Sequence, residues 1–76
     1  MIDLFKPGAQ LDDLLAAGIP AYVDAESGEL VAADGHGYGI TGWEDGWFLR
    51  LLSPTDARVA ALRGLGWVDA PRQVWA

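Results

Sequence analysis

The sequence predicts an α+β fold, in which a four-stranded antiparallel meander of two hairpins is flanked by a short N-terminal helix and a C-terminal helix. Three observations predict it. Leucines recur at helical spacing near residue 11, two apolar stretches each surround a glycine-containing turn, and a proline-containing capping pattern precedes residue 56. No linker or repeat interrupts the 76 residues, so we expect one small domain over 1–76.

The N-terminal part begins with a short extended segment over 2–5, which Pro7 and Gly8 end. The stretch AQLDDLLAAG follows, with leucines on one helical face and two aspartates on the other. Gly18 suits the position just beyond a helix, and Pro20 prevents its continuation. These signals predict a short helix over about 9–17.

The first predicted hairpin lies in AYVDAESGELVAA. A three-residue loop over 26–28 would place Gly28 in the left-handed conformation that such loops need. In this register Val23 lies opposite Val31. A turn over 34–37 then leads into the second hairpin.

The second predicted hairpin is centred on WEDGW, with a loop over 44–46 and Gly46 in the left-handed position. This register pairs Trp43 with Trp47. It also places Gly42 opposite Phe48 and Gly39 opposite Leu51, so that large side chains can lie over bare backbone.

The C-terminal helix is predicted over about 54–63. Ser53 fits the N-cap position, and Asp56 completes a variant of the capping box. Gly64 fits the position after the helix. The tail could add a short C-terminal edge strand near 72–75, just after Pro71.

Large apolar side chains point to both faces of the second predicted hairpin. One face carries Trp43, Trp47, Leu49 and Leu51, and the other carries Tyr38, Ile40, Phe48 and Leu52 together with Arg50. Half-solvated sheets normally alternate apolar and polar residues. Two short helices can cover one face, so we expect part of the hairpin to stay exposed and to bind a partner. The alternative is that the helices enclose the sheet and the aromatic residues fill the core.

Acidic residues concentrate around the predicted turns. Residues 24–45 hold six acids and no base, whereas residues 57–76 hold three arginines and one aspartate. Alternate turns of a meander lie at one end of the sheet, so four acids should cluster beside the aromatic hairpin: Glu26, Glu29, Glu44 and Asp45. Such a rim could dock a basic surface. The alternative is that these acids are simply solvated.

The net charge of −6 argues against direct nucleic-acid binding and against an anionic membrane surface. We find no signal peptide and no apolar run of the length that a membrane helix needs. These features predict a cytoplasmic protein. The arginine, alanine and glycine usage is associated with bacterial or phage genomes.

No catalytic, cofactor-binding or metal-binding pattern is present. The chain has no cysteine, and its single histidine, His36, lies between glycines in a predicted turn. The hydroxyl residues have no base placed beside them in sequence. We therefore expect neither an enzyme nor a cofactor.

The sequence thus predicts a small acidic interaction protein, an adaptor, stoichiometric inhibitor or assembly component, that binds a protein partner or a second copy of itself. One alternative is a mimic of nucleic-acid phosphates that inhibits a nucleic-acid-binding protein, and another is a glycan-binding module. The predicted partner-binding residues are Trp43, Glu44, Asp45, Trp47, Phe48, Glu26, Glu29 and Trp75.

Overall fold

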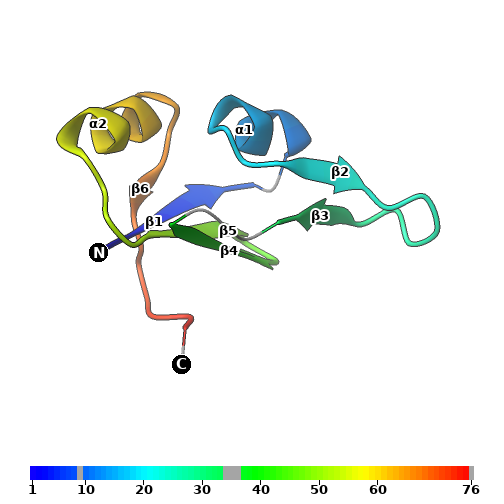
Figure 1. Ribbon diagram of the computed structural model, residues 1–76. Helices are drawn as coiled ribbons and strands as arrows, with labels where there is room; N and C mark the ends of the chain where they lie inside the picture. The colour runs from blue at the N-terminus through cyan, green and yellow to red at the C-terminus, as the bar shows by residue number, and fades with distance from the viewer. Residues whose placement is uncertain (9, 34–36, 76) are drawn as a thin grey trace.

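The computed structural model describes residues 1–8, 10–33 and 37–75, and it has the predicted α+β architecture (Figure 1). Within these described residues, two helices and six strands follow one another. Their order is β1 (Ile2–Pro7), α1 (Leu11–Ala16), β2 (Ala21–Val23), β3 (Leu30–Ala32), β4 (Tyr38–Trp43), β5 (Gly46–Leu51), α2 (Asp56–Gly64) and β6 (Val68–Asp69). The turn predicted over 34–37 lies largely outside the described residues.

The main sheet has four antiparallel strands in the order β4-β5-β1-β6, which confirms a four-stranded antiparallel sheet. The prediction that two hairpins build this sheet as a meander is wrong. Strands β2 and β3 form a separate two-stranded sheet, and β1 lies between β5 and β6 in their place. Turn signals report pairing between neighbouring segments, whereas β1 pairs with strands more than forty residues away, such as Ile2 with Leu51.

Both hairpins differ by one residue from the predicted register. In the second hairpin Gly42 lies opposite Trp47, and the connection is the two-residue turn Glu44-Asp45. Gly46 is therefore a strand residue and not part of the loop. A Cβ atom there would lie only 2.1 Å from the carbonyl oxygen of Lys6 in β1, so close approach of two backbones accounts for this glycine.

The first hairpin is closed by a loop that Asp24 organises. Its backbone N–H donates to the carbonyl of Glu29, and its carboxylate accepts hydrogen bonds from the N–H groups of Glu26 and Ser27. Val31 consequently lies opposite Tyr22, not opposite Val23 as predicted. Gly28 does adopt the predicted left-handed conformation, with φ of 71°.

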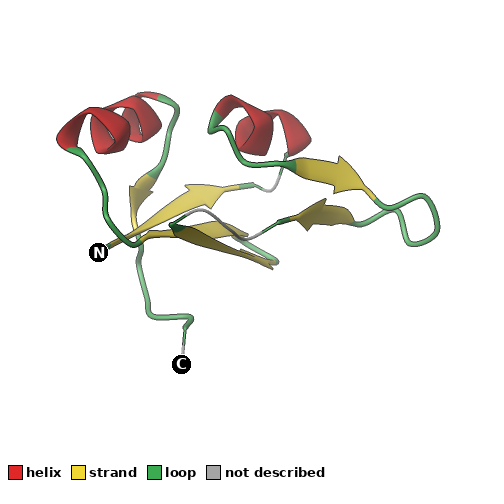
Figure 2. Ribbon diagram, in the orientation of Figure 1, coloured by secondary structure: helices red, strands yellow, loops and turns green. Residues whose placement is uncertain are grey.

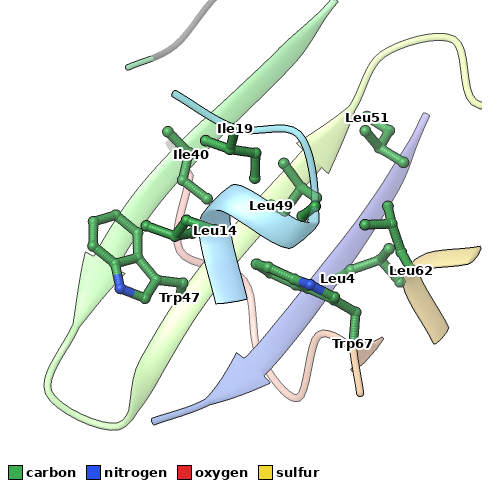
Figure 3. Packing of buried hydrophobic residues seen from close by; sticks show 10 residues of the cluster. Leu4, Leu14, Ile19, Ile40, Trp47, Leu49, Leu51, Leu62 and Trp67 are labelled. Carbon is green, nitrogen blue, oxygen red and sulfur yellow. The ribbon is translucent and has the colours of Figure 1, made fainter. Parts of the chain in front are cut away.

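The two faces of the main sheet are covered by different parts of the chain. Both helices lie over one face, and the segment after β6 leaves the sheet on the opposite side (Figure 2). The helix side holds a buried cluster in which Leu14 and Leu49 lie between Trp47 and Trp67 (Figure 3). On the opposite face Phe5 and Phe48 are in ring contact, with centroids 4.7 Å apart. Both faces of the hairpin are thus largely covered, and the expectation that part of it stays exposed holds for Trp43 but not for Trp47 and Phe48.

Both helices end in a glycine-containing Schellman motif, but they are shorter or shifted relative to prediction. After α1, Gly18 occupies the predicted position, and the N–H of Ile19 donates to the Leu14 carbonyl. After α2 the corresponding glycine is Gly66, not Gly64, and the N–H of Trp67 donates to the Leu62 carbonyl. In both cases the residue after the glycine is buried, which anchors the helix end in the core.

The start of α2 also differs from prediction, because Thr55 and not Ser53 is the N-cap residue. The hydroxyl of Thr55 accepts a hydrogen bond of 3.2 Å from the backbone N–H of Arg58. Ser53 is exposed and precedes the helix by three residues, too early to reach those donors.

We predict that Thr55→Ala lowers the free energy of unfolding by about 1 kcal/mol, the usual effect of removing an N-cap side chain. Ser53→Ala is the matched control and should change stability by less than about 0.5 kcal/mol. Chemical denaturation of both variants measures the difference. Equal destabilisation by the two substitutions would contradict the assignment of the cap.

The C-terminal edge strand is two residues long and lies at 68–69, before Pro71 instead of after it. Val68 and Asp69 pair with Phe5 and Leu4 of β1. Residues 70–75 then continue without regular structure.

Candidate partner-binding surface

The structure separates the predicted partner-binding residues into an exposed group and a buried group. Trp43 is 48% exposed, and the four predicted acids all lie at the surface. Trp47 and Phe48 are 8% and 0% exposed, so the expectation that they lie at the surface is wrong. Trp75 is partly buried.

The two buried aromatic residues are covered for different reasons. The ring of Trp47 lies on the helix side over Gly42, where a Cβ atom would come within 3.0 Å of it. Phe48 lies on the other side between Phe5 and the guanidinium of Arg72, which is 5.0 Å from the centre of its ring. Glycine does make room for a large side chain, as the sequence predicted, but the pair is Gly42 with Trp47.

Two of the predicted acids and Trp43 line one hollow of about 600 Å³. It lies between the start of β3 and the turn that joins β4 to β5, and its lining residues are Glu29, Leu30, Gly42, Trp43, Glu44 and Trp47. In Figure 1 the β2–β3 hairpin projects beyond the main sheet on the side where this turn lies. The hollow therefore combines an aromatic wall with two carboxylates, a combination that suits a cationic side chain.

The third acid of this region, Asp45, is already paired. Its carboxylate accepts hydrogen bonds from Nη1 and Nη2 of Arg72 at 2.7 and 3.1 Å. The same guanidinium lies 5.5 Å from the ring centre of Trp43. Trp43 thus has an intramolecular cation beside it and also forms part of the hollow. Glu26 lies in the exposed loop of the first hairpin and is not among the residues that line the hollow.

Sequence reasoning missed Arg72 as part of this surface. The signal that could have found it was the charge asymmetry along the chain, with an acidic excess over 1–56 and a basic excess over 57–76. Opposite charges in separate segments favour a tail that folds back on the acidic turns. Without the strand order, however, no pattern showed which acid the tail would meet.

All five basic side chains bind partners within the chain. Four form ion pairs, which are Lys6–Asp13, Arg50–Asp3, Arg63–Asp69 and Arg72–Asp45. Arg58 donates to the Ala17 carbonyl, and Lys6 also donates to the carbonyl of Leu65. Six acids of the described residues have no such ion pair, namely Asp12, Asp24, Glu26, Glu29, Glu44 and Asp56. The surface therefore presents uncompensated negative charge, much of it on the first hairpin and the β4–β5 turn.

The ion pair with Arg72 changes the acidity of Asp45. Hydrogen bonding from the guanidinium lowers the pKa of the Asp45 carboxyl and raises that of Arg72. The pair therefore stabilises the attachment of the tail at pH values above the usual aspartate pKa, and this contribution is lost as the pH falls through the lowered pKa.

We predict that Arg72→Ala returns the pKa of Asp45 toward the usual aspartate range, because the hydrogen-bond donor is removed. The measurement is a pH titration of the side-chain carboxyl carbons by NMR. Asp24 is the internal control, since backbone N–H groups of Ser27 and Glu26 lower its pKa and the substitution leaves them in place. An unchanged Asp45 titration would show that this ion pair does not persist in solution.

Within residues 1–8, 10–33 and 37–75, no three residues capable of ligating a metal come together, and no helix is long and apolar enough to span a membrane. His36 falls outside these ranges. The prediction that the protein is not an enzyme stays a prediction.

Comparison with known proteins gives no relative from which a function could be transferred. No family model matches the chain, and neither does any curated protein or solved structure.

Proposed function

We propose that this protein is a small acidic interaction protein that binds a basic protein partner stoichiometrically, as an adaptor, inhibitor or assembly component. The observation that carries the proposal is the exposed Trp43 in a hollow shared with Glu29 and Glu44. Tryptophan is enriched where interfaces gain most of their energy, and nearby carboxylates attract a basic partner. A cytoplasmic location and a bacterial or phage origin stay predictions.

The distribution of charge supports a basic partner. Every lysine and arginine side chain binds a group of the chain itself. The charged groups that remain available to a partner are therefore mostly carboxylates. Mimicry of nucleic acid is less well supported, because four of the eleven acids already pair with bases and cannot imitate phosphates. We therefore propose recognition of one basic side chain or segment at the hollow over imitation of a phosphate array.

The proposal is tested by capturing partners from the native source with the tagged wild-type chain. Trp43→Ala and Glu44→Lys should each reduce the amount of captured partner at least tenfold. The first removes the aromatic side chain of the hollow, and the second reverses the charge of one of its carboxylates. Asp12→Lys is the matched control. It makes the same charge change at an exposed position on α1 and should capture the partner as the wild type does.

Raising the salt concentration should weaken capture by the wild type, as expected for attraction between exposed charges. A partner retained equally by Glu44→Lys and Asp12→Lys would contradict the proposed surface. Capture of no protein at all by the wild type would contradict the proposed function.

A further inference from the structure

We propose that the sheet face opposite the helices is a docking site for an arginine-bearing, extended segment of the protein partner. In the free protein the chain's own residues 71–75 occupy this site and compete with that segment. This inference rests on the proposed function and names the chemistry that the partner would present.

The first half of the site holds a guanidinium. Asp45 accepts two hydrogen bonds from Arg72, and the rings of Trp43 and Phe48 lie 5.5 and 5.0 Å from its central carbon. A carboxylate with two aromatic faces matches the planar, delocalised charge of arginine better than the compact ammonium of lysine. The main sheet thus already contains a binding site for an arginine side chain.

The second half holds an aromatic ring three residues further along the bound segment. Arg50 lies 4.6 Å from the ring centre of Trp75 and also donates to the Gln73 side chain. Two hydrogen bonds of 2.7 and 2.8 Å to Asp3 fix the guanidinium of Arg50. The Trp75 ring lies over Gly39, 3.8 Å from the position that a Cβ atom would take there, which is ordinary van der Waals distance. The site therefore accepts an arginine and an aromatic residue at positions i and i+3.

Residues 71–75 are held weakly enough for a partner segment to replace them. The last backbone hydrogen bond before it runs from the Ala70 N–H to the Asp3 carbonyl, at 3.1 Å. Among the described residues, the backbone of 71–75 makes no hydrogen bond to the rest of the chain. Side chains alone hold it, and the Arg72–Asp45 pair is nearly half exposed. Release of this segment therefore breaks few interactions compared with opening of the sheet.

Two segments could occupy the site when residues 71–75 leave it, namely a segment of a partner protein or residues 71–75 of a second copy. Their net charges favour the partner protein. Two copies each carry a net charge of −6 and repel one another, whereas a basic segment is attracted. Glu44 lies next to Asp45, and Glu29 lies across the hollow from Trp43, so further basic residues of a partner would meet unpaired carboxylates beside the site. A partner's arginine segment is thus the favoured occupant.

The test uses the full chain and a capped peptide, Ala-Pro-Arg-Gln-Val-Trp, which copies residues 70–75. Isothermal titration calorimetry should show at least tenfold tighter binding to Arg72→Ala than to the wild type, because apparent affinity rises with the fraction of unoccupied sites. Adding Asp45→Asn to Arg72→Ala should remove this gain. Arg63→Ala is the matched control, since it breaks another exposed arginine–aspartate pair and should bind as the wild type does.

Circular dichroism checks that the variants fold. If Arg72→Ala does not fold, Trp75→Ala replaces it in the test, because it removes the contact that holds the other end of residues 71–75. Equal peptide affinity for Arg72→Ala and the wild type would overturn the docking site. So would equal affinity of Arg72→Ala for a peptide with alanine in place of arginine. If Arg72→Ala formed concentration-dependent dimers in analytical ultracentrifugation, the occupant of the site would be a second copy of the chain, and the proposed partner segment would be wrong. None of these results would alter partner capture at the hollow, which tests the proposed function separately.

Discussion

Trp67→Ala is expected to lower the free energy of unfolding by about 3–5 kcal/mol, the range for removing a large buried aromatic side chain. Trp67 is 1% exposed and belongs to the core cluster beneath the helices (Figure 3). It also ends the Schellman motif of α2, so its loss frees the helix end as well. A domain of 76 residues has a total stability of about 4–11 kcal/mol, so this change removes a large part of it.

The adjacent Val68 provides the control. It is 47% exposed, and Val68→Ala should cost less than about 1 kcal/mol. Chemical denaturation followed by far-ultraviolet circular dichroism measures both variants. Similar losses at positions 67 and 68 would show that the helices do not pack on the sheet as described.

Gly46→Ala is expected to destabilise the protein by about 3 kcal/mol or more. The new methyl group would meet the Lys6 carbonyl oxygen at 2.1 Å and the Phe5 ring at 2.8 Å. Forcing strands apart to relieve such overlap costs about 1–3 kcal/mol. The φ of 155° is also rare for residues with a side chain, and such strain adds about 1–3 kcal/mol.

Gly64→Ala is the opposite case and serves as the control. Gly64 is the last residue of α2, and a Cβ atom there would meet nothing within 4 Å. Alanine should therefore leave stability unchanged or raise it by up to about 1 kcal/mol. Thermal unfolding of the two variants compares them directly. Tolerance of alanine at position 46 would contradict the close packing of β1 against β5.

The helices could be placed from sequence because their signals are local. Leu14 is buried as the leucine spacing predicted, although Leu15 is 51% exposed, and Gly18 ends α1 as expected. The ends of α2 were misplaced because two caps were available at each end. Thr55 and Gly66 are used, since the Schellman motif at Gly66 allows Trp67 to enter the core.

The strand order could not be predicted, because it depends on pairing between distant segments. Nothing in IDLFKP shows that it lies between β5 and β6, since the turn residues around it mark only its ends. The wrong strand order also led to wrong predictions of which aromatic residues of the site are exposed. With β1 and the tail in place, Phe48 is covered, and only Trp43 of the predicted aromatic anchors remains well exposed.

The acidic part of the site was easier to predict than the aromatic part. Turn acids remain at the surface whatever the strand order, and Glu29 and Glu44 do line one hollow. The burial of an aromatic side chain depends instead on which element lies above it. The sequence patterns therefore located the charges but not the contact of Arg72 with the Trp43 and Phe48 rings.

The central position of β1 has a consequence for how the chain acquires its structure during synthesis. Leu4 is made before its neighbours in the sheet, Leu49 and Asp69, which follow it by 45 and 65 residues. Contacts this distant in sequence slow folding, because a long loop must close before they form. The β2–β3 ribbon can pair as soon as it emerges, whereas the main sheet cannot be completed until Val68 and Asp69 of β6 have been translated.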